Sequence, residues 1–207
     1  MDSARVMNSI QIRPARPTDA ALAAQLFQLS MGGLADYLFN NDSSFAKNSL
    51  MKLFSSNAGR FGFANALVAE VDGESVGLLV SYPGKKLPTL ALRTLPHLIS
   101  ILGLPRVFDF IRRGISLPGG KEAGTDEYYI SNVGVLPSAQ GRGIGARLLE
   151  YADETARHAH LMKCSLLVSL KNEGARRLYE RNGYQIVLTV QEKNKAPGYH
   201  RMVKDLA

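Results

Sequence analysis

The chain has 207 residues, 45% of them hydrophobic and 21% charged, which fits one ordinary globular domain with room for an insertion. Its single cysteine, Cys164, excludes an internal disulfide and a zinc cluster. No apolar run reaches the ~20 residues of a membrane span and the N-terminus lacks a signal-peptide core, so we expect a cytoplasmic protein. The net charge of +7, of which residues 142–207 carry +5, suits an anionic ligand, although nucleic acid or a solvated basic surface would also explain it.

The first half of the chain predicts an edge strand, two helices and a hairpin. Caps for the two helices are expected at Thr18 or Asp19 and at Ser43 or Ser44. Asp72-Gly73, between two apolar runs, is a strong hairpin signal. The predicted elements are the strand Ile10–Arg13, helices over about 17–29 and 43–54, and two strands within 66–82.

Residues 83–124 form an unusually long connection. Its stretches "LPHLISILG" and "LPRVFDFIRRG" each place a proline near the start and a glycine at the end, which is typical of a short helix. We therefore predict a helical insertion at about 83–124 whose apolar side chains must bury against something. These side chains are Leu95, Leu98, Ile101, Leu102, Val107, Phe108 and Ile111.

The second half predicts strands and helices in alternation. Together with the first half, this order indicates a mixed sheet with helices on its faces, an α/β (or α+β) fold class. The predicted elements are the strand Glu127–Leu136, the helix Ile144–His160, the strand Cys164–Leu170, the helix Glu173–Asn182 and the strands Tyr184–Glu192 and Tyr199–Lys204.

Three glycines at alternate positions, Gly141, Gly143 and Gly145, stand just before the predicted helix. Bare backbone at a helix N-terminus is a good phosphate site. The stretch "GRGIGA" matches the dinucleotide fingerprint G-x-G-x-x-A, which would indicate a nicotinamide-dependent oxidoreductase. Against this, "LPSAQ" separates the loop from its strand, the unit comes late in the chain, and the next strand, "CSLLVSL", has no acidic residue at its end for a ribose.

The same residues also read as Q-x-x-G-x-G, from Gln140 through Gly143 to Gly145. With "ISNVGVLPSAQ" before the loop and "NEGARRLYERNGY" after it, the stretch resembles the GCN5-related N-acetyltransferase superfamily, most strongly over Glu127–Tyr184. The resemblance implies one N-acetyltransferase domain over 1–207, with its core at about 10–206. It also implies a mostly antiparallel twisted sheet that splays at a bulged strand, with helices on both faces. The implied activity is acetyl-CoA-dependent acetylation of a primary amine, on a small molecule or a protein, by direct attack through a tetrahedral intermediate.

The resemblance places coenzyme A along the bulged strand and the glycine loop. Gly134 lies within the predicted strand, where a glycine often marks a bulge or a close approach of another backbone. The amides of Val133 and Val135 are implied to bind the cofactor, one of them polarising the thioester carbonyl, and Asn172 to bond the pantetheine arm. The implied cofactor-binding residues are Val133, Gly134, Val135, Gln140, Gly141, Arg142, Gly143, Ile144, Gly145, Ala146, Asn172 and Tyr179.

Tyr179 is implied by the resemblance to protonate the leaving thiolate. It also has a structural explanation, because Gly183 is expected to end the helix and bring Tyr184 against Tyr179. Asn172 is likewise a good helix N-cap. For Tyr179, the packing role and the role as proton donor are compatible, since a tyrosine can pack its ring and present its hydroxyl.

The general base stays open at this point. "CSLLVSLKN" has no acidic residue where some relatives carry a glutamate, and Tyr129 stands where other relatives carry one. Ser131 would share its face, and Glu70 and Glu127 are further candidates, although a solvated surface position would explain both carboxylates. A base acting through water is the other alternative.

The expected partners are acetyl-CoA and an amine acceptor, with a homodimer possible and no membrane. A non-enzymatic module that binds anions or nucleic acid ranks last, because no basic stripe alternates with aromatic residues. The histidines do not gather, since His158 and His160 are two apart on a helix, so we expect no metal. The insertion at 83–124 is expected to cover the acceptor cleft, extend the core or form a dimer contact.

Overall fold

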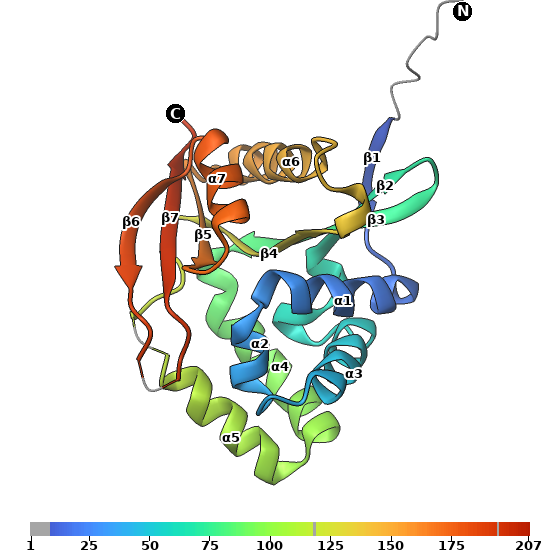
Figure 1. Ribbon diagram of the computed structural model, residues 1–207, viewed down its shortest axis with the longest axis vertical. Coiled ribbons are helices and arrows are strands. Elements are labelled where there is room, and N and C mark those ends of the chain that lie inside the picture. The colour runs from blue at the N-terminus through green and yellow to red at the C-terminus, as the bar shows by residue number, and fades with distance from the viewer. Residues whose placement is uncertain (1–8, 118, 194) are drawn as a thin grey trace, which may run out of the picture.

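The computed structural model describes residues 9–117, 119–193 and 195–207. Within these ranges seven strands form one sheet in the order β1-β2-β3-β4-β5-β7-β6, and only the β4–β5 pair is parallel (Figure 1). The predicted mixed, mostly antiparallel sheet is confirmed. The strands are β1 Ile10–Pro14, β2 Ala66–Val71, β3 Glu74–Pro83, β4 Tyr128–Val135, β5 Lys163–Ser169, β6 Gln185–Val190 and β7 Tyr199–Asp205.

Helices cover both faces of the sheet, as expected (Figure 1). The first five lie on one face, where a core of buried side chains includes Leu26, Phe27 and Phe54, and the last two lie on the other, with Leu148 and Leu149 at zero exposure. The helices are α1 Ala20–Met31, α2 Gly33–Leu38, α3 Ser43–Ser55, α4 Leu87–Leu102, α5 Leu104–Ile115, α6 Ile144–His158 and α7 Glu173–Arg181.

Both predicted helix caps in the first half need correction. The N-cap of α3 is Asp42, whose carboxylate accepts from the amide of Phe45 at 2.9 Å, and not Ser43 or Ser44. Asp19 does occupy the N-cap position of α1, but its carboxylate makes no cap bond there. It turns back to the amide of Arg16 instead, at 2.7 Å. This bond belongs to a capping box of the 3-10 turn Pro17–Asp19, and the guanidinium of Arg13 also donates to the same carboxylate.

The hairpin prediction is confirmed at Asp72-Gly73. Both residues have positive φ, +54° and +81°, as a two-residue turn matched to the strand twist requires. The β2–β3 ladder is antiparallel and pairs Val71 with Glu74 across this turn.

The insertion forms two helices that enlarge the core on the α1–α3 side. α4 begins at Leu87, eight residues before the predicted start, and continues through Pro96. α5 packs through Phe110 against Phe39, with ring centroids 5.3 Å apart. Leu98, Leu102 and Val107 are buried and Leu95 and Ile101 partly so, but the expectation that Phe108 and Ile111 bury is wrong, since they are 69% and 37% exposed.

Candidate active site

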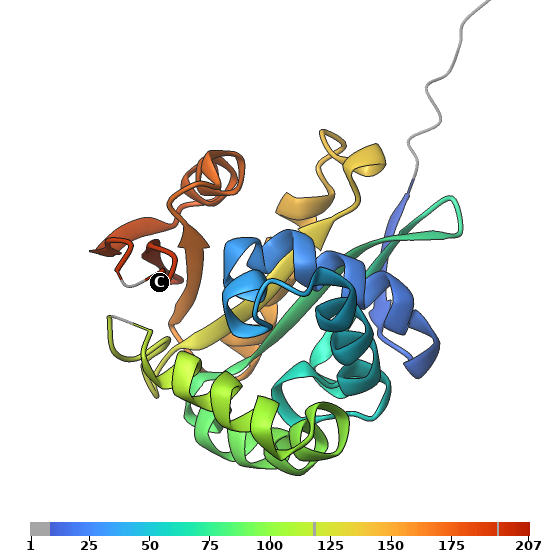
Figure 2. The same cartoon turned by 60° about the horizontal axis from the view of Figure 1, so that its bottom comes forward.

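β4 separates from β5 along its second half. The two strands pair from Tyr128–Cys164 to Ile130–Leu166, and no pairing follows. β5 continues beside β7 as far as Ser169, so the two halves of the sheet diverge (Figure 2). We call this region, where residues 131–135 of β4 have no partner on β5, the splay. It matches the splayed strand that the resemblance implied.

The direction of the β4 amides follows from one hydrogen bond. The amide of Leu136 donates to the carbonyl of Val76 on β3 at 2.8 Å. Alternate residues of a strand turn their amides to the same side, so the amide of Gly134 also faces β3. The amides of Val133 and Val135 therefore face the splay, where no neighbouring strand pairs with them.

The bulge in β4 lies at Ser131, not at Gly134. The register with β3 shifts between Val80 and Ser81, which leaves Ser131 as the extra residue, whereas Gly134 pairs regularly with Leu78. Gly134 instead marks a close approach. A Cβ there would lie 3.3 Å from the carbonyl oxygen of Leu26, so glycine lets α1 pack directly on the strand.

The glycine loop adopts a backbone conformation that favours glycine at two positions. Gly141 and Gly143 adopt φ of +77° and +80° with open space around them, so backbone conformation and not crowding selects glycine. The loop is tied to the splay by Gln140, whose side-chain amide donates to the carbonyl of Val135 at 3.1 Å. Arg142 is 42% exposed and lies 3.8 Å from Asp72 at the hairpin turn.

The N-terminus of α6 is open to an anion. The amides of residues 143–146 are the ones that an α-helix leaves without an intrahelical acceptor, and no side chain caps them. The first turn holds no acidic residue, so the helix dipole is not neutralised there. Gly145 faces α7, where a Cβ would come within 2.9 Å of a Leu178 methyl group. Ile144 is buried beneath the loop, and Ala146 follows it in the same turn.

Tyr179 lies in α7, on the same face of the sheet as α6. It belongs to the same apolar cluster as Val133 and Val135 and is 6% exposed. Its ring stands 6.1 Å from that of Tyr184, after a helix stop at Gly183 with φ of +88°, so the predicted packing is confirmed. Burial alone raises the pKa of Tyr179 above its ordinary 10.0, so the hydroxyl keeps its proton at neutral pH.

Asn172 caps α7, as its alternative explanation predicted. Its side-chain oxygen accepts from the amide of Ala175 at 3.1 Å. It comes three residues after the end of β5, on the connection that leaves the sheet beside the splay.

Tyr129 and Ser131, two of the base candidates, lie where β4 leaves β5. Tyr129 is 3% exposed, and its hydroxyl donates to Glu122 at 3.0 Å. Burial, and then the neighbouring Glu122 charge, raise the pKa of Tyr129 well above 10.0, so this phenol stays protonated. The hydroxyl of Ser131 donates to the side chain of Asn132 at 3.1 Å.

Glu122 is a residue that sequence reasoning missed. It comes from the loose connector between α5 and β4, where no periodicity or motif singled it out. Both its oxygens accept from Arg60, at 3.1 and 2.6 Å. Burial raises the pKa of Glu122, but the charge and hydrogen bonds of Arg60 outweigh it, so the net shift is downward.

Glu127, at the start of β4, is held in a similar way. It is 7% exposed, and both its oxygens accept from Arg201 at 2.5 Å. Burial raises the pKa of Glu127, but the hydrogen bonds from Arg201 and from the amide of Gly124 outweigh this effect, so the net shift of the pKa is downward. The carboxylate is thus a structural ion-pair partner of β7.

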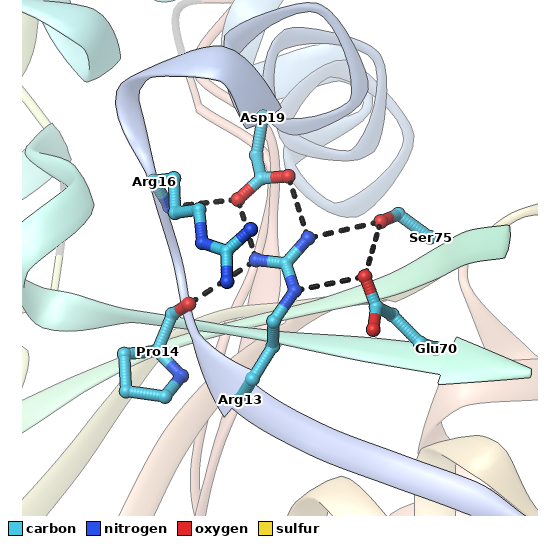
Figure 3. Close-up of polar contacts among 6 residues, drawn as sticks. All are labelled: Arg13, Pro14, Arg16, Asp19, Glu70 and Ser75. Atoms are coloured by element: carbon cyan, nitrogen blue, oxygen red, sulfur yellow. Dashed lines mark hydrogen bonds and ion pairs between the residues drawn. The ribbon is translucent and has the colours of Figure 1, made fainter. Parts of the chain in front are cut away.

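Glu70 is not brought to the splay, because β3 separates its strand from β4. Figure 3 shows Arg13 between Glu70 and Asp19, with Ser75 alongside. The Arg13 guanidinium donates to Glu70 at 2.8 Å and to both oxygens of Asp19 at 2.8 and 2.9 Å. These bonds lower the pKa of both carboxyl groups and join β1, β2 and the turn before α1.

Replacing Arg13 with methionine is expected to lower the free energy of unfolding by about 1 to 2 kcal/mol at pH 7, because Asp19 stays buried without its guanidinium. Arg13 lowers the folded-state pKa of Asp19 and Glu70 below their ordinary 3.8 and 4.5. The stabilisation is therefore present above those values and lost as pH falls through the folded-state pKa.

Urea unfolding of wild type and Arg13→Met at pH 7 and at about pH 2.5, below both ordinary pKa values, measures this difference. The matched control is Arg147→Met, since Arg147 pairs with Glu150 at 3.0 Å but both side chains are about half exposed. Its effect should stay under about 0.5 kcal/mol. Equal losses in the two variants would contradict the assigned role of Arg13.

Other kinds of site find little support in the described ranges. No group of three or more His, Cys, Asp or Glu side chains there is placed to hold a metal ion. Among the helices of those ranges, none is long and apolar enough to cross a membrane. Cys164 is buried, with a thiol whose pKa burial raises.

Comparisons with known proteins agree with this geometry. The family profile described as "Acetyltransferase (GNAT) family" matches residues 41–184. A comparison with curated proteins found no match. Among solved structures, an N-acetyltransferase from Staphylococcus aureus Mu50 is 26% identical with a TM-score of 0.68, and the alignment covers 93% of this chain and 99% of that one.

Two further structures show the same fold. One described as an acetyltransferase is 24% identical with a TM-score of 0.69, covering 95% of this chain and all of that one. The ribosomal-protein-S18-alanine N-acetyltransferase from Escherichia coli is 15% identical with a TM-score of 0.56, covering 96% and 95%.

The family match spans more than half of the chain and includes the splay, the glycine loop and α7. It decides against the oxidoreductase and against the non-enzymatic binding module. Members of this family typically use an acyl-CoA donor. The chain thus belongs to the acetyltransferase (GNAT) family and is an N-acetyltransferase.

Proposed function

We propose that the donor is acetyl-CoA, bound along β4 with its pyrophosphate at the glycine loop. The observation that carries this is the pair of amides, Val133 and Val135, that face the splay after β4–β5 pairing has ended at Ile130. A pantetheine arm has amide groups that can pair with such an open strand edge. The amides of residues 143–146 and the charge of Arg142 suit the pyrophosphate.

Bound acetyl-CoA supplies an activated acetyl thioester. In our proposal, amides of the splay stabilise the carbonyl oxygen as it becomes negative during attack by the amine. Tyr179 then donates its proton to the leaving sulfur. Its hydroxyl carries that proton at neutral pH, and its ring belongs to the apolar cluster against which Val133 and Val135 pack. Asn172 holds the arm from the end of β5.

We further propose that the acceptor amine loses its proton through water. Glu70, Glu122 and Glu127 each accept from an arginine, and each has a lowered pKa, so none is a strong base. Tyr129 stays protonated, and Ser131 bonds its neighbour. The acceptor is a primary amine of a small molecule or a protein.

The experiment is a turnover assay with acetyl-CoA and a panel of primary amines, which follows release of the coenzyme A thiol. The panel contains a polyamine, an amino sugar, a lysine-containing peptide and a peptide with a free α-amino group. Thiol release should require one of these amines, and kcat/KM should rise with pH toward the pKa of the amine itself. Release that is independent of every amine would overturn the proposed reaction, and a titration limb between pH 5 and 7 would overturn the water route.

A further inference from the structure

α5 carries a row of large apolar side chains that nothing in the described chain covers. Leu104, Phe108 and Ile115 are 71%, 69% and 80% exposed, and Ile111 is 37% exposed. The side of the helix next to this row is packed, with Val107 buried and Phe110 against Phe39. Single exposed apolar residues are ordinary, but four in a row on one helix mark an interaction surface.

The spacing of this row indicates another helix as the partner. The intervals of four, three and four residues are those of a coiled-coil seam, which is narrower than the wide apolar face of a helix that lies on a membrane. The intervals are also the same in both chain directions. When the helix is reversed, Leu104 falls on Ile115 and Phe108 falls on Ile111.

We propose that α5 packs antiparallel against α5 of a second copy of this chain, about a two-fold axis between Phe108 and Ile111. In this arrangement Leu104 of each copy meets Ile115 of the other, and Phe108 meets Ile111. A two-fold interface requires such self-complementarity. Figures 1 and 2 show α5 on the outside of the molecule, with the other helices of its face between it and the sheet, so a second copy has access to it.

The charges of α5 support this partner over an anionic surface. Arg106 lies 4.2 Å from the centre of the Phe45 ring, and Arg112 pairs with Asp109 at 3.2 Å on its own helix. Arg113 donates to the Tyr37 carbonyl. Each arginine of α5 is thus engaged within its own subunit, and no charge lies on the seam.

The one small residue of α5, Gly114, lies beside the seam and allows close packing. A Cβ at Gly114 would meet no atom within 4 Å, so the space next to Ile111 and Ile115 is open to another helix. The four side chains offer on the order of 400 Å² per copy, about half of the roughly 800 Å² per partner in a standard interface. We therefore expect a dimer that dissociates in the micromolar range.

Sedimentation equilibrium over about 1 to 200 µM tests the proposal, with 22.6 kDa as the mass of the monomer. Leu104→Glu and Ile115→Lys should each weaken self-association about 30-fold or more, by exposing a charge to an apolar partner. The double variant should recover most of it, because the new glutamate of one copy meets the new lysine of the other only in the antiparallel register. Circular dichroism confirms that each variant is folded.

The matched control is Leu92→Glu on α4, since Leu92 is also 71% exposed but lies outside the row. Its self-association should equal that of wild type, and turnover should be unchanged in Leu104→Glu. A wild-type monomer at 200 µM, a dimer that survives Leu104→Glu, or a double variant no tighter than the singles would each overturn the proposal. Flotation with phosphatidylglycerol vesicles that Leu104→Glu abolishes would assign the row to a membrane instead.

Discussion

Replacing Gly143 with glutamate is expected to weaken acetyl-CoA binding by about 100-fold or more, which calorimetric titration measures directly. Gly143 has φ of +80°, where any side chain strains the backbone, and it begins the helix whose amides we assign to the pyrophosphate. A carboxylate at this point would also repel the phosphates. Wild type should bind acetyl-CoA in the micromolar range and show no heat with NAD.

Gly103→Glu is the matched control for this titration. Gly103 links α4 to α5 with φ of +75°, and as at Gly143, a Cβ added there would have no atom within 4 Å. The backbone strain at Gly103 is at least as large, because its ψ of 157° lies in a region that only glycine adopts readily, whereas Gly143, with ψ of −1°, is in the left-handed helical region. The new charge at Gly103, however, lies on the other face of the sheet. Acetyl-CoA affinity should stay within about twofold of wild type, and equal loss in both variants would show that strain, not charge at the loop, weakens binding.

Tyr179→Phe is expected to lower kcat about 100-fold, because the leaving thiolate loses its proton donor. The ring remains to pack on Tyr184, so the thermal midpoint and the affinity for acetyl-CoA should change little. Stopped-flow measurement of thiol release with a saturating amine gives kcat. Burial keeps the Tyr179 hydroxyl protonated above pH 9, so the loss should be similar from pH 7 to 9.

Tyr184→Phe separates this catalytic role from packing. The Tyr184 hydroxyl is buried and donates to Asp153 at 3.3 Å, so its removal should cost about 1 kcal/mol of stability. kcat should remain near that of wild type. A Tyr179→Phe variant with full kcat would leave Tyr179 with its packing role alone, and a large loss of kcat in Tyr184→Phe would show that packing controls turnover.

Local chemistry made much of this molecule predictable. The turn at Asp72-Gly73, the cap by Asn172 and the helix stop at Gly183 each depend on a few adjacent residues. A φ preference, or a side chain that reaches an amide three residues away, determines such features without help from the rest of the chain. The glycine loop belongs to the same class, which is why the family could be inferred before the fold.

The ion pairs of Glu70, Glu122 and Glu127 were beyond sequence reasoning. Arg13 and Glu70 are 57 residues apart in the chain, Arg60 and Glu122 are 62 apart, and Glu127 and Arg201 are 74 apart. Glu70 and Glu127 look like available bases until their arginines are known, and Glu122 has no sequence signal at all. Only the fold brings the partners together, and the partner decides whether the pKa of the carboxyl rises or falls.

The sequence by itself determined the order of the strands and of the helices other than α2, together with the mixed sheet and the glycine loop, since these follow from periodicity and from short-range turn and cap signals. The family followed from the resemblance of the loop and of the stretches that flank it. Tertiary structure decided that the bulge lies at Ser131, that arginines hold the carboxylates, and that Phe108 stays exposed while Val107 is buried. The physical reason is that a hydrophobic pattern shows that a helix has an apolar side, whereas burial depends on which distant elements pack against that side.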